Sequence, residues 1–113
     1  YLAQMKEYAK REVRPEMEHL KKQLSALTDA YEKCVADVTA KSNTELTDFH
    51  ARRMVEMAAN IIMGYLLLHD AQREPAYTSS AELFLPIAVS ENSTRADFIA
   101  SFEEKELGLY KVN

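Results

Sequence analysis

The spacing of apolar residues predicts a long amphipathic helix over residues 15–40. Its apolar positions alternate at intervals of three and four residues, which is the pattern of helices that pack nearly parallel or antiparallel in bundles. These positions are Met17, Leu20, Leu24, Leu27, Tyr31, Cys34 and Val38. A shorter helical stripe precedes them over residues 1–13, and Pro15 predicts a break or kink between the two because Pro disfavours helical geometry in the residue before it.

A second long helix is predicted over residues 45–73. Ser42 and Glu45 fit a capping box at its start, and the pair Glu74–Pro75 predicts its end. The connector between the two long helices is short, so we expect them to lie antiparallel and adjacent.

The most apolar part of the chain, MVEMAANIIMGYLLLHDA over residues 54–71, lies in this second helix. One face carries an apolar stripe made of Met54, Met57, Ala58, Ile61, Tyr65 and Leu68. The opposite side changes from polar, at Asn60, to apolar, at Met63 and Leu67. A helix that is apolar all round is buried all round, and two neighbouring helices of a small domain cannot cover it. Asn60, Met63 and Leu67 are therefore predicted to form an interface with a second copy or with a larger protein.

A third helical stripe follows from Tyr77 to Ala88, with Ser79 and Glu82 as a second capping box. Pro86 lies inside this stripe and removes a backbone hydrogen bond, at a cost of about 3 kcal/mol, so we expect a kink or a break there. The polar segment 90–94 is a candidate loop before a last short helix over residues 95–107.

These elements together predict an all-α fold. We expect an up-down bundle of three long helices, the third kinked or split near Pro86, that forms a single domain over residues 1–113. The two glycines and three prolines among 113 residues agree with long helices, because few turns can be made from them.

Charge and composition exclude several classes of function. Acidic and basic residues are mixed along the chain and give a net charge of −4, which argues against a nucleic-acid surface. The unbroken apolar run 61–68 is much shorter than the roughly 20 residues of a membrane span. Cys34 is the single cysteine, so an intrachain disulfide and a multi-cysteine zinc site are excluded, and a reducing, cytoplasmic location is expected.

Few residues offer catalytic chemistry. Glu16 and His19 have the Glu-x-x-His spacing of carboxylate-bridged di-metal bundles, but no second such pair exists and a surface role is favoured. His69 is adjacent to Asp70, and neighbouring residues of a helix do not face each other, so we expect His69 to act as a cation near the helix C-terminus. Cys34 is predicted to be a buried, inert thiol. No catalytic, cofactor-binding or metal-binding residue is assigned.

The segment HARRMVEMAANIIMGYLLLHDAQRE, residues 50–74, with EMEHLKKQL before it and SAELF after it, resembles the extreme C-terminal helical region of certain bacterial acyl-CoA dehydrogenases. These are longer forms that carry an extra domain after the flavin-binding dehydrogenase body. The resemblance covers most of residues 10–85 and is a packing signature without a functional motif. It implies a parent enzyme that oxidises an acyl-CoA thioester with FAD, whose catalytic base and FAD and CoA contacts lie upstream of this chain.

The chain begins with Tyr1 inside a helical pattern, which favours a C-terminal fragment of a longer polypeptide. The resemblance implies a non-catalytic role for it: docking on the dehydrogenase body, or forming the subunit contacts of a homo-oligomer. A free-standing helical module that binds a protein partner is the alternative. A metal-dependent bundle enzyme is the least favoured hypothesis.

Overall fold

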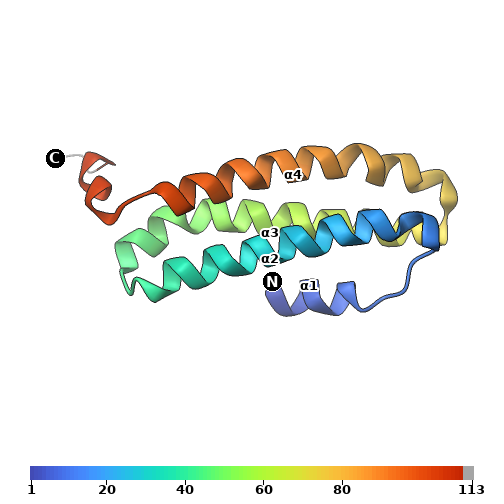
Figure 1. Cartoon of the computed structure of the whole chain (residues 1–113), viewed down its shortest axis with the longest axis horizontal. Coiled ribbons are helices and arrows are strands. Elements are labelled where there is room, and N and C mark those ends of the chain that lie inside the picture. Colours follow the sequence, from blue (N-terminus) through green and yellow to red (C-terminus); the bar gives the residue numbers. More distant parts are fainter. Residues whose placement is uncertain (111–113) are drawn as a thin grey trace.

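Three long helices form an up-down bundle in the computed structural model, which describes residues 1–110 (Figure 1). They are α2 (Glu18–Ala40), α3 (Thr44–Arg73) and α4 (Thr78–Ser101). The described residues contain no strand, and the bundle measures 54 × 23 × 18 Å. The predicted all-α bundle of three long helices is confirmed.

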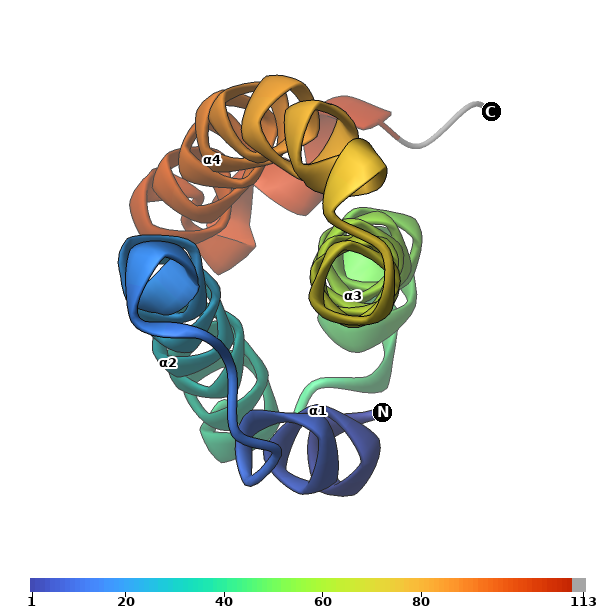
Figure 2. The ribbon, with the colours of Figure 1, turned by 90° about the vertical axis from the view of Figure 1, so that its right-hand side faces the viewer.

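A short helix, α1 (Leu2–Ala9), lies between α2 and α3 on the side of the bundle away from α4 (Figure 2). The chain then becomes extended at Arg14, and Pro15 begins a short 3-10 helix, Pro15–Met17, that leads into α2. The predicted break near Pro15 is therefore confirmed. Met5 anchors α1 because its side chain is fully buried against the bundle.

Both predicted capping boxes are wrong. The cap of α3 is Asn43, whose side-chain oxygen accepts a hydrogen bond from the backbone N–H of Leu46 at 3.1 Å. Ser42 instead adopts a positive φ of 49° to complete the tight turn, so its side chain is not the cap. Ser79 lies inside α4, which follows directly from a second 3-10 helix, Pro75–Tyr77.

Helix α4 continues through Pro86 and ends at Ser101, so of the expected kink or split near Pro86 the split does not occur, and the loop expected at 90–94 is wrong. The separate last helix over residues 95–107 is wrong for the same reason, since the chain beyond α4 forms a third 3-10 helix, Glu104–Tyr110. Pro86 is exposed, whereas Leu85 and Ala88 beside it are fully buried. Burial on both sides of Pro86 holds the helix against the loss of one hydrogen bond.

The core is built from the helical stripes that the sequence predicts. Every predicted apolar position from Met17, at the end of the first 3-10 helix, to Val38 in α2 is buried. In α3 the positions Met57, Ala58, Ile61, Tyr65 and Leu68 are buried with them. Helix α4 closes the core with Ala81, Leu85, Ala88 and Ile99. The apolar stripes of the three long helices therefore meet along the bundle axis.

Candidate interaction surface on α3

The outer surface of α3 carries apolar side chains that the bundle leaves exposed. Val55, Met63 and Leu66 are 49%, 48% and 43% exposed, and Ala59 lies between them on the same face. Their spacing of four, four and three residues places them on one side of the helix. We call these four residues the outer stripe.

A hollow of about 260 Å³ lies over the outer stripe. Half-buried Ile62 and exposed Tyr1, from the start of the chain, complete its lining, so all six lining residues are apolar or aromatic. Contiguous exposed apolar surface of this kind marks interaction sites on soluble proteins.

The structure separates the three residues that the sequence places at an interface. Met63 belongs to the outer stripe. Leu67 is half-buried and packs against the core. Asn60 donates hydrogen bonds to Glu91 and to Asn92 of α4, both at 3.0 Å, so its polar partners lie within this chain. The cause is α4, which covers this side of α3 because it remains one helix.

Val55, Ala59 and Leu66 were not predicted to be part of an exposed face. The signal was present, since these residues share a 3–4 spacing with Met63. The pattern alone does not say which flank of an apolar helix its neighbours cover.

Charged residues lie at both ends of the outer stripe. At one end the Arg52 side chain is 90% exposed and forms an ion pair with Glu56 at 3.2 Å. At the other end Asp70 pairs with Arg73. Hydrogen bonds from Arg52 and from Arg95 of α4 lower the pKa of Glu56, so this carboxylate stays ionised. The stripe is thus an apolar strip with an ion pair at each end.

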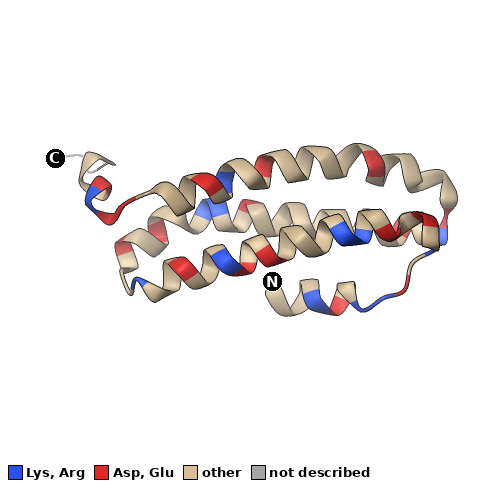
Figure 3. Cartoon of the chain, viewed as in Figure 1, with Lys and Arg blue, Asp and Glu red and all other residues tan. Residues whose placement is uncertain are grey.

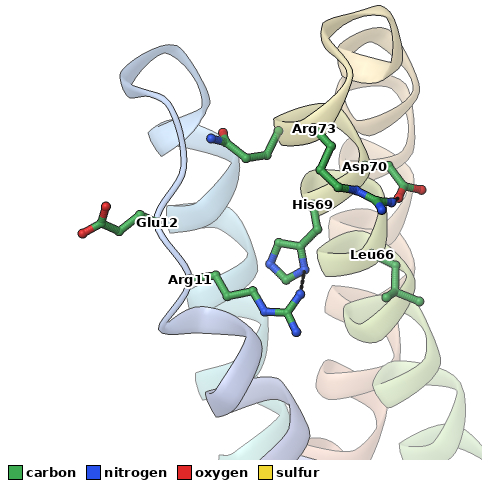
Figure 4. A pocket seen from close by; sticks show the side chains of 7 residues that line it. Arg11, Glu12, Leu66, His69, Asp70 and Arg73 are labelled. Carbon is green, nitrogen blue, oxygen red and sulfur yellow. Dashed lines mark hydrogen bonds and ion pairs between the residues drawn. The ribbon is translucent and has the colours of Figure 1, made fainter.

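A second hollow, of about 310 Å³, lies where the end of α1 meets α3 (Figure 4). Arg11 points toward His69 there, with 3.3 Å between its guanidinium nitrogen and Nδ1 of the imidazole. Burial and then Arg11 lower the pKa of His69, which corrects the expectation that His69 is a cation. Glu12 and Asp70 match the charge of Arg11 and Arg73, so this hollow has no excess of either sign.

The remaining candidate residues are Glu16, His19 and Cys34. Glu16 and His19 are exposed at the start of α2, and residues 1–110 contain no group of three or more His, Cys, Asp or Glu side chains that could hold a metal ion. Cys34 is buried in the core, as predicted, and burial raises the pKa of its thiol, which disfavours the reactive thiolate.

Each of the four α-helices carries charges of both signs, and the middle of α3 carries none (Figure 3). Within the described residues, none of the helices has the length and apolarity that crossing a membrane requires. Across residues 1–110, the outer stripe is one of two exposed apolar surfaces on the long helices, since Leu83 and Ile87 of α4 are 73% and 55% exposed.

Comparison with known protein families identifies relatives of this bundle. The profile of the family described as acyl-CoA dehydrogenase C terminal matches residues 1–107. The chain belongs to this family. The resemblance seen in residues 50–74 is thereby confirmed.

A solved relative of this acyl-CoA dehydrogenase C-terminal domain has the same fold. This relative is an acyl-CoA dehydrogenase family protein from Porphyromonas gingivalis, whose crystal structure is known. Its sequence is 36% identical to this chain, and the two structures superpose with a TM-score of 0.87. The match covers 91% of this chain and 90% of that one, so the two chains are of nearly equal length. No curated protein sequence matches the chain.

Proposed function

We propose that this acyl-CoA dehydrogenase C-terminal domain is a non-catalytic contact domain. It docks on the dehydrogenase body of a longer chain or joins subunits of the enzyme, and its role is structural. The observation that carries the proposal is the outer stripe, which keeps Val55, Met63 and Leu66 exposed beside a well-buried core. Exposing these side chains is unfavourable in water, and a partner surface removes the cost.

The arrangement of the titratable side chains supports a structural role. His50 is buried among Phe49, Phe98 and Phe102, with ring centroids 5.2 to 6.1 Å away. Burial, followed by the charges of Arg53 and Lys41, lowers the pKa of His50 and keeps it neutral. An imidazole enclosed by aromatic rings contributes to packing and is poorly placed to exchange protons with a substrate.

The proposal assigns the chemistry to the dehydrogenase body. A carboxylate base removes the alpha proton of the acyl-CoA there, and FAD accepts hydride from the beta carbon. We therefore expect FAD in the longer enzyme and no contribution from residues 1–113 to the reacting atoms.

Deleting this domain from the longer enzyme tests the proposal. The flavin absorbance and the rate of flavin reduction by acyl-CoA should stay with the body, while the mass in solution or the thermal midpoint should fall. The domain alone should leave the fluorescence of added FAD unchanged. Binding of FAD or acyl-CoA by the isolated domain, or loss of flavin reduction from a folded body, would contradict the proposal.

A further inference from the structure

The outer stripe is complementary to itself. We infer that it packs against the outer stripe of a second copy, with the two α3 helices antiparallel and a two-fold axis between Ala59 and Met63, at the level of the buried Ile61 along the helix. This inference rests on the proposed contact role and specifies the partner.

The positions along α3 carry the argument. Arg52 and Asp70 lie nine residues before and nine residues after Ile61, and Ala59 and Met63 lie two before and two after it. A two-fold contact requires each residue on one copy to face its symmetry counterpart on the other, in both directions. Antiparallel helices that meet on their outer faces at the level of Ile61 therefore bring Arg52 of one copy to Asp70 of the other, at both ends of the contact.

The apolar residues obey the same symmetry. The small side chain of Ala59 faces the long side chain of Met63, so a protrusion meets a recess at the centre. Val55 and Leu66, six and five residues from Ile61, form the next pair outward. The result is an apolar centre with charged edges, which is the usual arrangement of a protein interface.

The charges select the direction of packing. Each end of the antiparallel pair places the ion pair Arg52–Glu56 beside the ion pair Asp70–Arg73 of the other copy, so that charges alternate in sign. Parallel packing would bring Arg52 against Arg52 and Asp70 against Asp70. Like charges across an interface are unfavourable, so the parallel arrangement is disfavoured.

The size of the stripe sets the strength of the contact. Arg52 and Asp70 lie about 27 Å apart along the helix, and a helix is about 11 Å wide, so each copy buries on the order of 300 Å². Stable interfaces bury about 1,200 Å² or more in total, so this contact is weak on its own. Self-association should appear in the upper micromolar range or above, and in the longer enzyme it should add to other subunit contacts.

A charge swap tests the two-fold contact, with the dissociation constant measured by sedimentation equilibrium up to millimolar concentration. Arg52→Glu and Asp70→Arg should each raise the constant by about tenfold, and the double variant should restore it to within about threefold of the original. Within one copy the two positions are about 27 Å apart, well beyond the screening length at physiological salt. Rescue by the double variant therefore requires two copies.

Met63→Glu should abolish self-association, and Leu83→Glu, on the exposed face of α4, is the matched control that should leave it unchanged. Failure of the charge swap to restore association overturns the antiparallel contact. In the longer enzyme, Met63→Glu distinguishes the two proposals. If it loosens the domain from the body while self-association of the chain persists, the two-fold contact is overturned and the contact role stands. If Met63→Glu changes neither the docking on the body nor the self-association of the chain, both the contact role and the two-fold contact are overturned.

Discussion

Gly64 of α3 packs directly against Leu24 of α2. A β-carbon added at Gly64 would lie 2.5 Å from Cδ2 of Leu24 and 3.1 Å from Cδ2 of Leu85. Both leucines are fully buried, so they have little room to move. Side chains of α2 and α4 therefore fill the space that a side chain at position 64 would need.

We predict that Gly64→Ala destabilises the fold by up to about 2 kcal/mol, because overpacking at about 1–3 kcal/mol outweighs the helix-propensity gain of about 1 kcal/mol. Leu24→Ala removes the obstructing side chain. In that background only the 3.1 Å approach to Leu85 remains, so the same Gly64→Ala change should be less destabilising by about 1 kcal/mol or more. Urea unfolding of the four variants measures both effects, and equal effects in the two backgrounds would show that Leu24 is not the obstacle.

Asn92 fixes the pairing of α3 and α4. Its side chain is 2% exposed, donates to the carbonyl of Met57 at 3.2 Å and accepts from Asn60 at 3.0 Å. Asn92→Ala should cost about 1–3 kcal/mol, since a buried hydrogen-bonded group is lost and its partner on Asn60 is left with one acceptor fewer. Ser93→Ala, at the neighbouring exposed position, should change stability by less than about 0.5 kcal/mol. Thermal unfolding compares the two, and equal midpoints would refute a special role for Asn92.

His50 should make the fold sensitive to mild acid. Its pKa is lowered in the folded state by burial, then by Arg53 and Lys41, so the unfolded chain binds the proton more readily. Stability is complete above the ordinary histidine pKa of about 6.5 and falls as the pH drops below it, by at most about 1.4 kcal/mol per pH unit for one site. The pKa of His69 is lowered too, so it adds to the same slope.

Substitution of His50 by Gln should flatten this slope without abolishing it. The comparison variant is His69→Gln, which should remove the part of the pH dependence of stability that the burial of His69 causes. The measurement is denaturant unfolding at several pH values between roughly 7.5 and 5.5, a range that brackets the ordinary histidine pKa. An unchanged slope in the His50 variant would mean that this imidazole titrates alike in the folded and unfolded chain.

Leu67 and Met63 should respond differently to the same substitution. Leu67 is half-buried against the core, so Leu67→Glu should destabilise the fold by about 1–3 kcal/mol, because an apolar contact is lost and a carboxylate is partly desolvated. Met63 is exposed, so Met63→Glu should change the free energy of unfolding by less than about 0.5 kcal/mol. Circular dichroism during chemical unfolding reports both, and a stable, well-folded Leu67→Glu chain would place Leu67 on the outer surface with Met63.

The local pattern of the chain predicts most of this fold. The a/d spacing from Met17 to Val38 depends only on the geometry of a helix, and all of these residues are buried. The break near Pro15 and the end of α3 before Pro75 follow from the restriction that Pro imposes on its neighbour. The candidate surface is only partly accessible to the same reasoning, since Met63 was found and Val55, Ala59 and Leu66 were not.

Several features depend on contacts between segments far apart in the sequence. Asn43, and not Ser42, caps α3, because Ser42 adopts a left-handed conformation in the turn before the helix. Helix α4 continues through Pro86 because the buried residues around it gain more from packing on α3 than one hydrogen bond is worth.

The apolar segment 54–71 shows how the two kinds of information divide. By itself the sequence determined that this helix is central and that its apolar surface exceeds what its own bundle can cover. Only the tertiary structure decided which side stays exposed, because that depends on where α4 lies. With α4 along Asn60 and with Leu67 half-buried against the core, the exposed apolar surface of this helix lies at Val55, Ala59, Met63 and Leu66.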